Sequence, residues 1–304
     1  MFKNLTIIYT FRILSFLPLI ICSATRLYSQ DTGFPENWGR WKTRILLTAE
    51  NLGPNALPVP EIRNGSIFEK AFFELSGCGH KSSVDKTINP FFKLSLPFAE
   101  GKVAVEVWSA FAEYFEADTS SLTERKAWNK NSSGYSGGDI YFATLIQVLK
   151  DHHFLPDILV SINLKTASGN NLESLRHTDS PGYHFDLSMG KSFKLGENYT
   201  LKPFGLFGLY VYQTHQVMAL QNDALLWGGG VVLSGSVFEL NTSIGGYHGY
   251  FNQGDRPIVA RLSTQIHFNN SLSGVVGIQQ GIHDFDYTSF NLGVYYRFLS
   301  FKPK

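Results

Sequence analysis

The stretch FNLGVYYRF at residues 290–298 alternates apolar residues with small or polar ones, position by position. A period of two is typical of a β-strand whose two faces meet different surroundings. Such a strand suits either a half-buried edge of a soluble sandwich or the wall of a membrane barrel. The apolar face of the stretch carries Phe290, Leu292, Val294, Tyr296 and Phe298.

Similar extended segments, rich in Val, Ile, Phe, Tyr and Thr, follow one another from residue 66 onward. We count twelve, at 66–77, 88–98, 102–117, 139–149, 157–167, 183–193, 199–212, 223–233, 237–248, 258–268, 272–282 and 288–299. Those at 157–167, 183–193 and 258–268 repeat the clear alternation of the closing segment. A charged side chain that faces lipid at mid-depth costs about 2–4 kcal/mol, so we expect the polar sets to face inward.

The separators between these segments differ in length in a regular way. Short separators stand at 98–102, 150–156, 194–198, 234–236 and 269–271, and longer polar ones at 78–88, 118–138, 168–182, 214–222, 249–257 and 283–287. Outer-membrane barrels have short periplasmic turns and longer outer loops, and an even strand number. The sequence therefore predicts an all-β, transmembrane, antiparallel up-and-down barrel of about 12 strands over residues 66–304. A secreted β-sandwich is the alternative.

The beginning of the chain is typical of an exported protein. Lys3 and Arg12 precede the apolar run ILSFLPLIICSA at 13–24, which is shorter than the roughly 20 residues of a membrane-spanning helix. We interpret residues 1–30 as a signal peptide, cleaved after 24 or after 30. The expected location is the bacterial outer membrane, reached after export through the inner membrane.

Residues 31–65 differ from everything that follows. The stretch ENLGPNALPVPEI at 50–62 contains three prolines, which exclude a central strand. The segment is interpreted either as an N-terminal periplasmic extension or as a partial plug inside the barrel.

Composition narrows the function. The chain has 28 Gly, 25 Phe and 14 Tyr, and a net charge of +1 argues against nucleic acid as a partner. A single cysteine after residue 30, Cys78, excludes a disulfide framework within one chain. Neither His152 and His153 nor Cys78 and His80 supply enough ligands for a closed metal site, so we expect no cofactor and no metal.

Two resemblances add to this picture. Residues 294–298, Val-Tyr-Tyr-Arg-Phe, resemble the C-terminal insertion signal of bacterial outer-membrane barrels, although the tail 299–304 follows the final aromatic residue. That resemblance implies outer-membrane lipids and the barrel-assembly machinery as partners. The layout of 138–169, with Gly-Asp-Ile, Pro-Asp and Lys-Thr-x-x-Gly, is similar to phenol-degradation-type transporter barrels and implies a porin-like or uptake barrel without a defined substrate.

The inward polar positions provide the candidate lumen residues. They could line an aqueous path or form a closed, salt-bridged interior, and the sequence leaves both open. The set comprises Glu106, Asp157, Lys165, Asp186, Glu239, Arg261, His267 and Arg297.

We therefore expect a passive channel or uptake barrel that takes a small-molecule solute. A structural or partner-binding barrel without a conducting pore is the alternative. A barrel enzyme acting on lipid is disfavoured, because His184 and Ser188 would lie about 13 Å apart along one strand. No catalytic residue is predicted.

Overall fold

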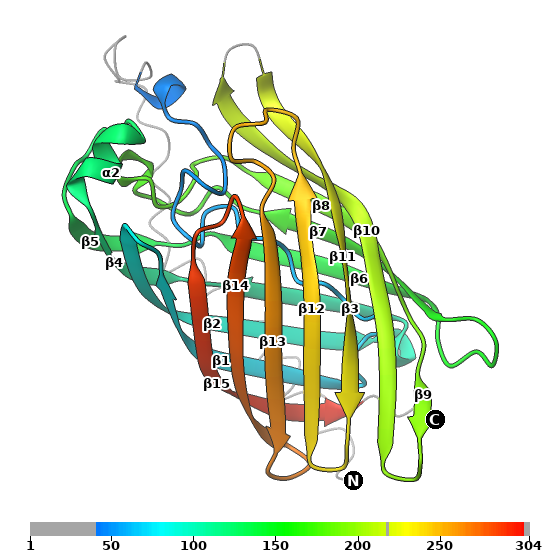
Figure 1. Cartoon of the computed structure of the whole chain (residues 1–304). Coiled ribbons are helices and arrows are strands. Elements are labelled where there is room, and N and C mark those ends of the chain that lie inside the picture. The colour runs from blue at the N-terminus through cyan, green and yellow to red at the C-terminus, as the bar shows by residue number, and fades with distance from the viewer. Residues whose placement is uncertain (1–40, 217–218, 301–304) are drawn as a thin grey trace, which may run out of the picture. The chain divides into compact units, whose positions relative to one another are not determined.

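The computed structural model describes residues 41–216 and 219–300, and the predicted signal peptide lies outside them. Fifteen strand segments form one antiparallel sheet, in which β1 pairs with both β2 and β15 and so closes the sheet (Figure 1). Three strands are each interrupted once, giving the consecutive segments β3 and β4, β5 and β6, and β8 and β9. The result is the closed twelve-stranded barrel that the sequence predicts.

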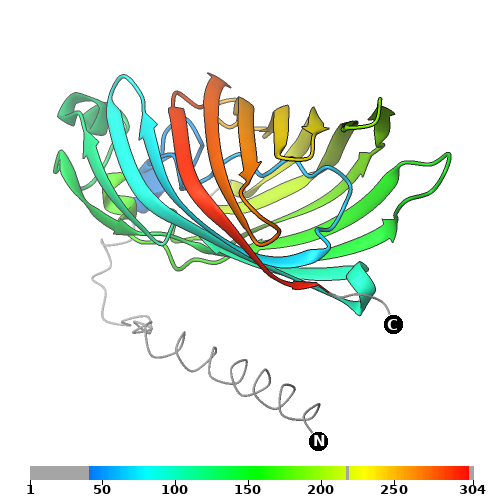
Figure 2. The same ribbon diagram turned by 90° about the horizontal axis from the view of Figure 1, so that it is seen from below.

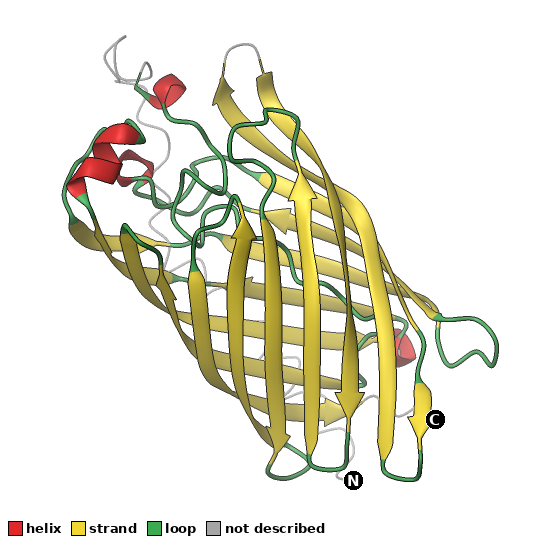
Figure 3. Ribbon diagram, viewed as in Figure 1, coloured by secondary structure: helices red, strands yellow, loops and turns green. Residues whose placement is uncertain are grey.

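The strands are long and the helices few (Figure 3). No helix in the described ranges is long and apolar enough to cross a membrane. The helical elements are η1 (Lys42–Arg44), η2 (Ala99–Gly101), α2 (Thr119–Glu124) and η3 (Leu172–Ser174). The strands are β1 (Lys70–Lys81), β2 (Asp85–Phe98), β3 (Val103–Ser109), β4 (Ala112–Ala117), β5 (Ser133–Gly137), β6 (Ile140–Leu149), β7 (Asp157–Lys165), β8 (Gly182–Gly190), β9 (Phe193–Leu195), β10 (Tyr199–Gln216), β11 (Ala219–Ser234), β12 (Phe238–His248), β13 (Ile258–His267), β14 (Leu272–His283) and β15 (Thr288–Ser300).

The alternation in sequence becomes an alternation of faces. Along β8, exposed and buried residues alternate without interruption, with the apolar side chains outside. The five apolar residues of the closing stretch also point outward, and Leu292 is 58% exposed. An apolar outer surface around a polar interior is the reverse of a soluble sandwich and suits a barrel surrounded by lipid.

The two rims of the barrel differ. The first pair of the β1–β15 ladder, Lys70 with Ser300, lies at the rim that carries the short turns 99–102, 150–156 and 268–271. We call it the inner rim. The opposite, outer rim carries α2 and the loops 166–181 and 249–257.

Three loop predictions at the outer rim are wrong in part. The predicted loop 118–138 contains β5 (Ser133–Gly137). Only residues 82–84 separate β1 from β2, where the sequence suggested a loop over 78–88, and β10 and β11 run through most of 214–222. Inward polar side chains such as His80 and Asn222 continue the strands toward the rim, where they hydrogen-bond to neighbours. Inward polar residues near the end of a strand make its sequence resemble that of a loop.

Residues 41–69 run inside the barrel from the outer rim to the inner rim, and we call them the luminal segment (Figure 2). At the outer rim Trp41 stacks on Trp128, with ring centroids 5.9 Å apart. At the inner rim the hydroxyl of Ser66 donates to Asp157 at 2.8 Å. Between them, the apolar residues of the segment, including Leu52 and Leu57, share a core with inward residues of β10 to β13.

Candidate functional site

One side of the lumen, formed by β2 to β10, holds the luminal segment through charged groups, and we call it the charged wall. Glu106, on β3, is buried and accepts from Arg63 of the segment at 2.7 Å. Lys93, on β2, lies 3.4 Å from Glu106 and 2.7 Å from Glu61 of the segment. These four side chains form one chain of alternating charge, which fastens the segment at mid-lumen.

The other predicted acids and the lysine of this wall are also buried and engaged. Asp157 accepts from Lys202 at 2.8 Å, in addition to Ser66. Lys165 lies 2.7 Å from Asp139, a partner that the sequence did not suggest. Asp186 accepts from the amide of Asn163 at 3.2 Å.

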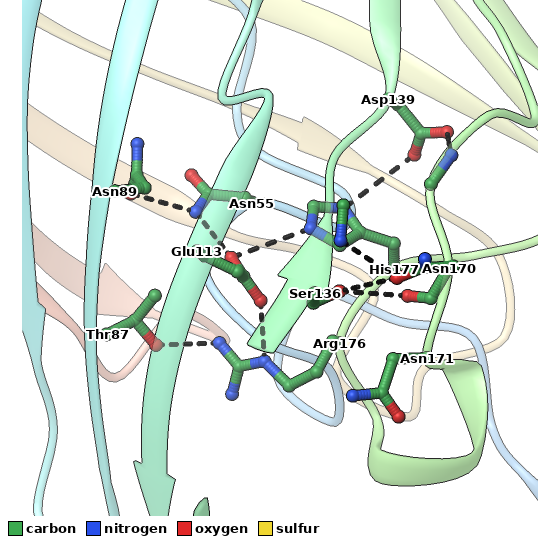
Figure 4. Close-up of polar contacts among 12 residues, drawn as sticks. Asn55, Thr87, Asn89, Glu113, Ser136, Asp139, Asn170, Asn171, Arg176 and His177 are labelled. Atoms are coloured by element: carbon green, nitrogen blue, oxygen red, sulfur yellow. Dashed lines mark hydrogen bonds and ion pairs between the residues drawn. The ribbon is translucent and has the colours of Figure 1, made fainter. Parts of the chain in front are cut away.

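A second group of charges lies toward the outer rim, and we call it the outer cluster: Asp85, Glu113, Asp139, Lys165, Arg176 and His177. Figure 4 shows Glu113, Asp139, Arg176 and His177 of this cluster. Arg176 comes from the loop 166–181, which folds into the lumen, and its Nε donates to Glu113 at 2.7 Å. The imidazole Nε2 of His177 lies 3.5 Å from the same carboxylate. The amide of Asn55, in the luminal segment, donates to Glu113 at 2.8 Å and to Asn89 at 3.0 Å. Loop, wall and luminal segment therefore meet at one carboxylate.

The end of the luminal segment is also held at the outer rim. Asp179, in the loop 166–181, pairs with Lys42 of the segment and with His215 of β10, the latter at 2.6 Å. Burial disfavours the charge of Asp179, but the hydrogen bonds from His215 and Lys42 outweigh it and hold the pKa of this carboxyl well below its usual range.

The opposite side of the lumen, formed by β12 to β15 and β1, carries few charges at mid-depth. The strand register sets its inward residues in two rows, and we call these rows the polar wall. One row is Asn241, Ser263, Gly277, Asn291 and Cys78, and the other is Ser243, Arg261, Gln279, Ser289 and His80.

Arg261 is the one residue of these two rows with a permanent charge. It forms hydrogen bonds with the luminal segment and not with an acid. Its guanidinium donates to the backbone carbonyls of Pro60 and Val59, the first at 2.8 Å, and to the side chain of Gln279 at 2.7 Å. All three acceptors are neutral. Because two of them lie in the luminal segment and the third lies on β14, Arg261 links the segment to the polar wall.

A cavity of about 390 Å³ lies in the lumen, bordered by the luminal segment at 58–63 and by side chains of the polar wall. A second cavity, of about 460 Å³, lies at the inner rim and is bordered by Gln265, His267 and Arg297. Tyr295, on β15, borders both cavities. The two cavities therefore follow one another along β13 to β15 toward the inner rim, with Tyr295 in the lining of each.

The remaining predicted lumen residues lie near that rim. Arg297 and His267 share the hydroxyl of Ser273, at 2.8 and 3.0 Å, and Glu239 accepts from Ser234 at 3.4 Å. Within the described ranges neither Arg261 nor Arg297 forms an ion pair with a carboxylate. In the same ranges, no three His, Cys, Asp or Glu side chains are grouped so that they could hold a metal ion.

Comparisons with known proteins identify the fold. No family model and no curated protein matches the sequence. Among solved structures, an outer-membrane channel from Pseudomonas putida F1 matches with a TM-score of 0.54 and 11% identity, over 79% of this chain and 100% of that one. The NanC porin matches with a TM-score of 0.49 and 10% identity, over 74% of this chain and 100% of that one. The KdgM porin matches with a TM-score of 0.44 and 10% identity, over 74% and 99%.

The fold is that of a porin-like outer-membrane β-barrel. Together with the apolar outer surface, it places the protein in the bacterial outer membrane, as the sequence predicts.

Proposed function

We propose that the protein is a passive outer-membrane channel for small solutes, narrowed by the luminal segment acting as a plug. The observation that carries this proposal is the pair of cavities between the plug and the barrel wall, which follow one another toward the inner rim and share Tyr295 as a lining residue. Space bordered by polar side chains holds water, and a water-filled path through a barrel conducts small solutes.

Conductance in planar bilayers tests the channel. We expect the purified protein to show a small conductance, and a variant that lacks 41–62 to show a much larger one, because the deletion removes the plug but keeps the approach to β1. Heat-modifiable migration on a gel verifies that each barrel is folded. Folded barrels that both fail to conduct would contradict the channel.

The second candidate is a closed barrel with a structural or partner-binding role. It is favoured by the apolar core that the luminal segment shares with β10 to β13, which fills that side of the lumen. Absence of conductance in the folded deletion variant would support this candidate.

Labelling of introduced cysteines tests which end of the luminal segment faces the outside of the cell. Contacts put Arg44 near the outer rim and Glu69 near the inner rim, and both side chains are exposed. In a Cys78→Ser background, we expect Arg44→Cys to react with a membrane-impermeant maleimide added to intact cells, and Glu69→Cys to react only after the outer membrane is permeabilised. The reverse pattern would contradict the orientation.

The outward stripe of β15 would act during assembly. Its aromatic residues face the side from which lipids and the barrel-assembly machinery approach, and Phe298 is the last of them in the described ranges. We expect Phe298→Ala to lower the amount of heat-modifiable barrel in the membrane while export remains normal. Unchanged assembly would contradict this role.

A further inference from the structure

The cavity beside the plug differs from the rest of the lumen in the kind of polar group it offers. Its polar wall presents amides and hydroxyls, including Asn291, Gln279, Ser263 and Ser243. These side chains both donate and accept hydrogen bonds. They come from four neighbouring strands in direct register, so a solute that moves across them meets partners at each step.

The charged groups that border the same cavity already have partners: Glu74 accepts from the hydroxyl of Ser76 at 2.8 Å, and Asp139 pairs with Lys165. Glu61 is paired with Lys93, and Arg63 with Glu106, at 2.7 Å each. Arg261 has three acceptors. A charged solute would have to separate one of these contacts, and breaking the buried pair of Arg63 and Glu106 would leave an uncompensated charge. An uncharged solute needs no such separation.

Aromatic rings complete the lining. Trp108 stacks on Tyr141 with ring centroids 5.3 Å apart, and both border the cavity. Tyr295 borders this cavity and also the one at the inner rim. The ring faces can pack against the C–H groups of a solute, and the amides and hydroxyls can form hydrogen bonds with its polar groups.

We propose that the polar wall selects uncharged polyhydroxyl solutes of the size of a monosaccharide. Such a molecule carries hydroxyl groups that donate and accept, has C–H faces for the rings, and carries no net charge. A cavity of about 390 Å³ is in the range of sites that hold small molecules. This inference rests on the proposed channel function and adds the class of solute to it.

Swelling of liposomes that contain the purified protein tests the proposal. The three probes are glucose, glucuronate and glucosamine, which share a ring size and differ in charge. We expect glucose to enter several-fold faster than either charged sugar. Entry of glucuronate or glucosamine at the rate of glucose would overturn the selectivity.

A matched pair of variants assigns the selectivity to the polar wall. Asn291→Leu keeps the size of the side chain but removes its donor and acceptors. The loss of one or two hydrogen bonds of about 1 kcal/mol each corresponds to a roughly 5- to 30-fold slower entry of glucose. Asn131→Leu, in the exposed loop after α2 and away from the cavity, should leave entry unchanged.

Potassium chloride conductance, measured on the same preparations, separates the two proposals. Conductance without preference for glucose overturns the solute class and leaves the channel. Absence of both conductance and swelling overturns the channel and, with it, the solute class. Conductance with a preference for glucose that Asn291→Leu lowers and Asn131→Leu retains supports both.

Discussion

The charged wall and the polar wall of the lumen use polar side chains for different purposes. On the charged wall, buried acids and bases pair with each other and with the luminal segment, as Glu106 does with Arg63. On the polar wall, neutral side chains such as Asn291 and Ser263 border open space. In this barrel, charged side chains hold the luminal segment in place, whereas uncharged polar side chains border the remaining space.

The largest effect should follow from breaking the chain of charges. Glu106→Gln leaves Arg63 and Lys93 buried beside each other with one acid fewer, and we expect a loss of about 3–5 kcal/mol in the free energy of unfolding. On the polar wall, Asn291→Leu should cost less than about 1.5 kcal/mol. Unfolding of both variants in detergent, followed by heat modifiability against denaturant, measures the difference. Equal losses would remove the distinction between the two walls.

A bulky residue beneath the plug should change conductance strongly. A Cβ on Gly228 would lie 2.5 Å from the side chain of Ile62, so Gly228→Phe should push the luminal segment from its place and raise conductance several-fold. Gly205→Phe, on β10, is the control, because the nearest atom to its Cβ is 3.7 Å away. Unchanged conductance in Gly228→Phe would show that the segment does not narrow the path.

Reversal of a charge at the inner rim tests whether a charged residue outside the charged wall also contributes to stability. Arg297 borders the cavity there and donates to Ser273, and the described residues give it no carboxylate partner. We expect Arg297→Glu to shift the reversal potential toward cation selectivity with little change in stability, because the side chain borders a cavity and has no ion pair to lose among the described residues. A loss of stability as large as that of Glu106→Gln would mean that this end of the lumen is closed.

We expect the smallest effect on stability from the ion pairs of Asp179 at the outer rim. Lys42, Asp179 and His215 are partly exposed, so Asp179→Asn should cost only about 0.2–1 kcal/mol. Because the pKa of Asp179 is lowered in the folded protein, its contribution is full above the ordinary value near 3.8 and is lost as pH falls through the lower folded value. The protection factors of the amides at 42–45, which correct for the faster intrinsic exchange at higher pH, should therefore be equal at pH 7 and pH 5, and lower in Asp179→Asn at both.

The fold followed from the sequence because period two and turn chemistry are local signals. The luminal segment could not be placed in the same way. Its prolines exclude a strand, but they do not distinguish a position in the lumen from one outside. Inward glycines at 228 and 245 leave room for Ile62, a residue far away in the chain, so their pattern had no local explanation.

Apart from Lys165, the outer cluster escaped prediction for a related reason. The chain is irregular at 110–111, between β3 and β4, so the inward parity changes from even to odd and Glu113 joins Glu106 inside the barrel. Arg176 and His177 lie in a loop, whose direction no periodicity reveals. Lys93 could have been found, because Thr87, Asn89, Lys93 and Ser95 alternate with more apolar neighbours along β2.

The course of the luminal segment has a consequence for the order of assembly. The segment continues directly into β1, and β1 completes the ring by pairing with β15, the last strand of the chain. This contact has the greatest separation in sequence, so its loop-closure entropy makes it the slowest to form. The apolar core between the segment and β10 to β13 can form earlier, on an open sheet. We therefore expect the segment to serve as a template around which the sheet curls, with the seam closing last and trapping it inside.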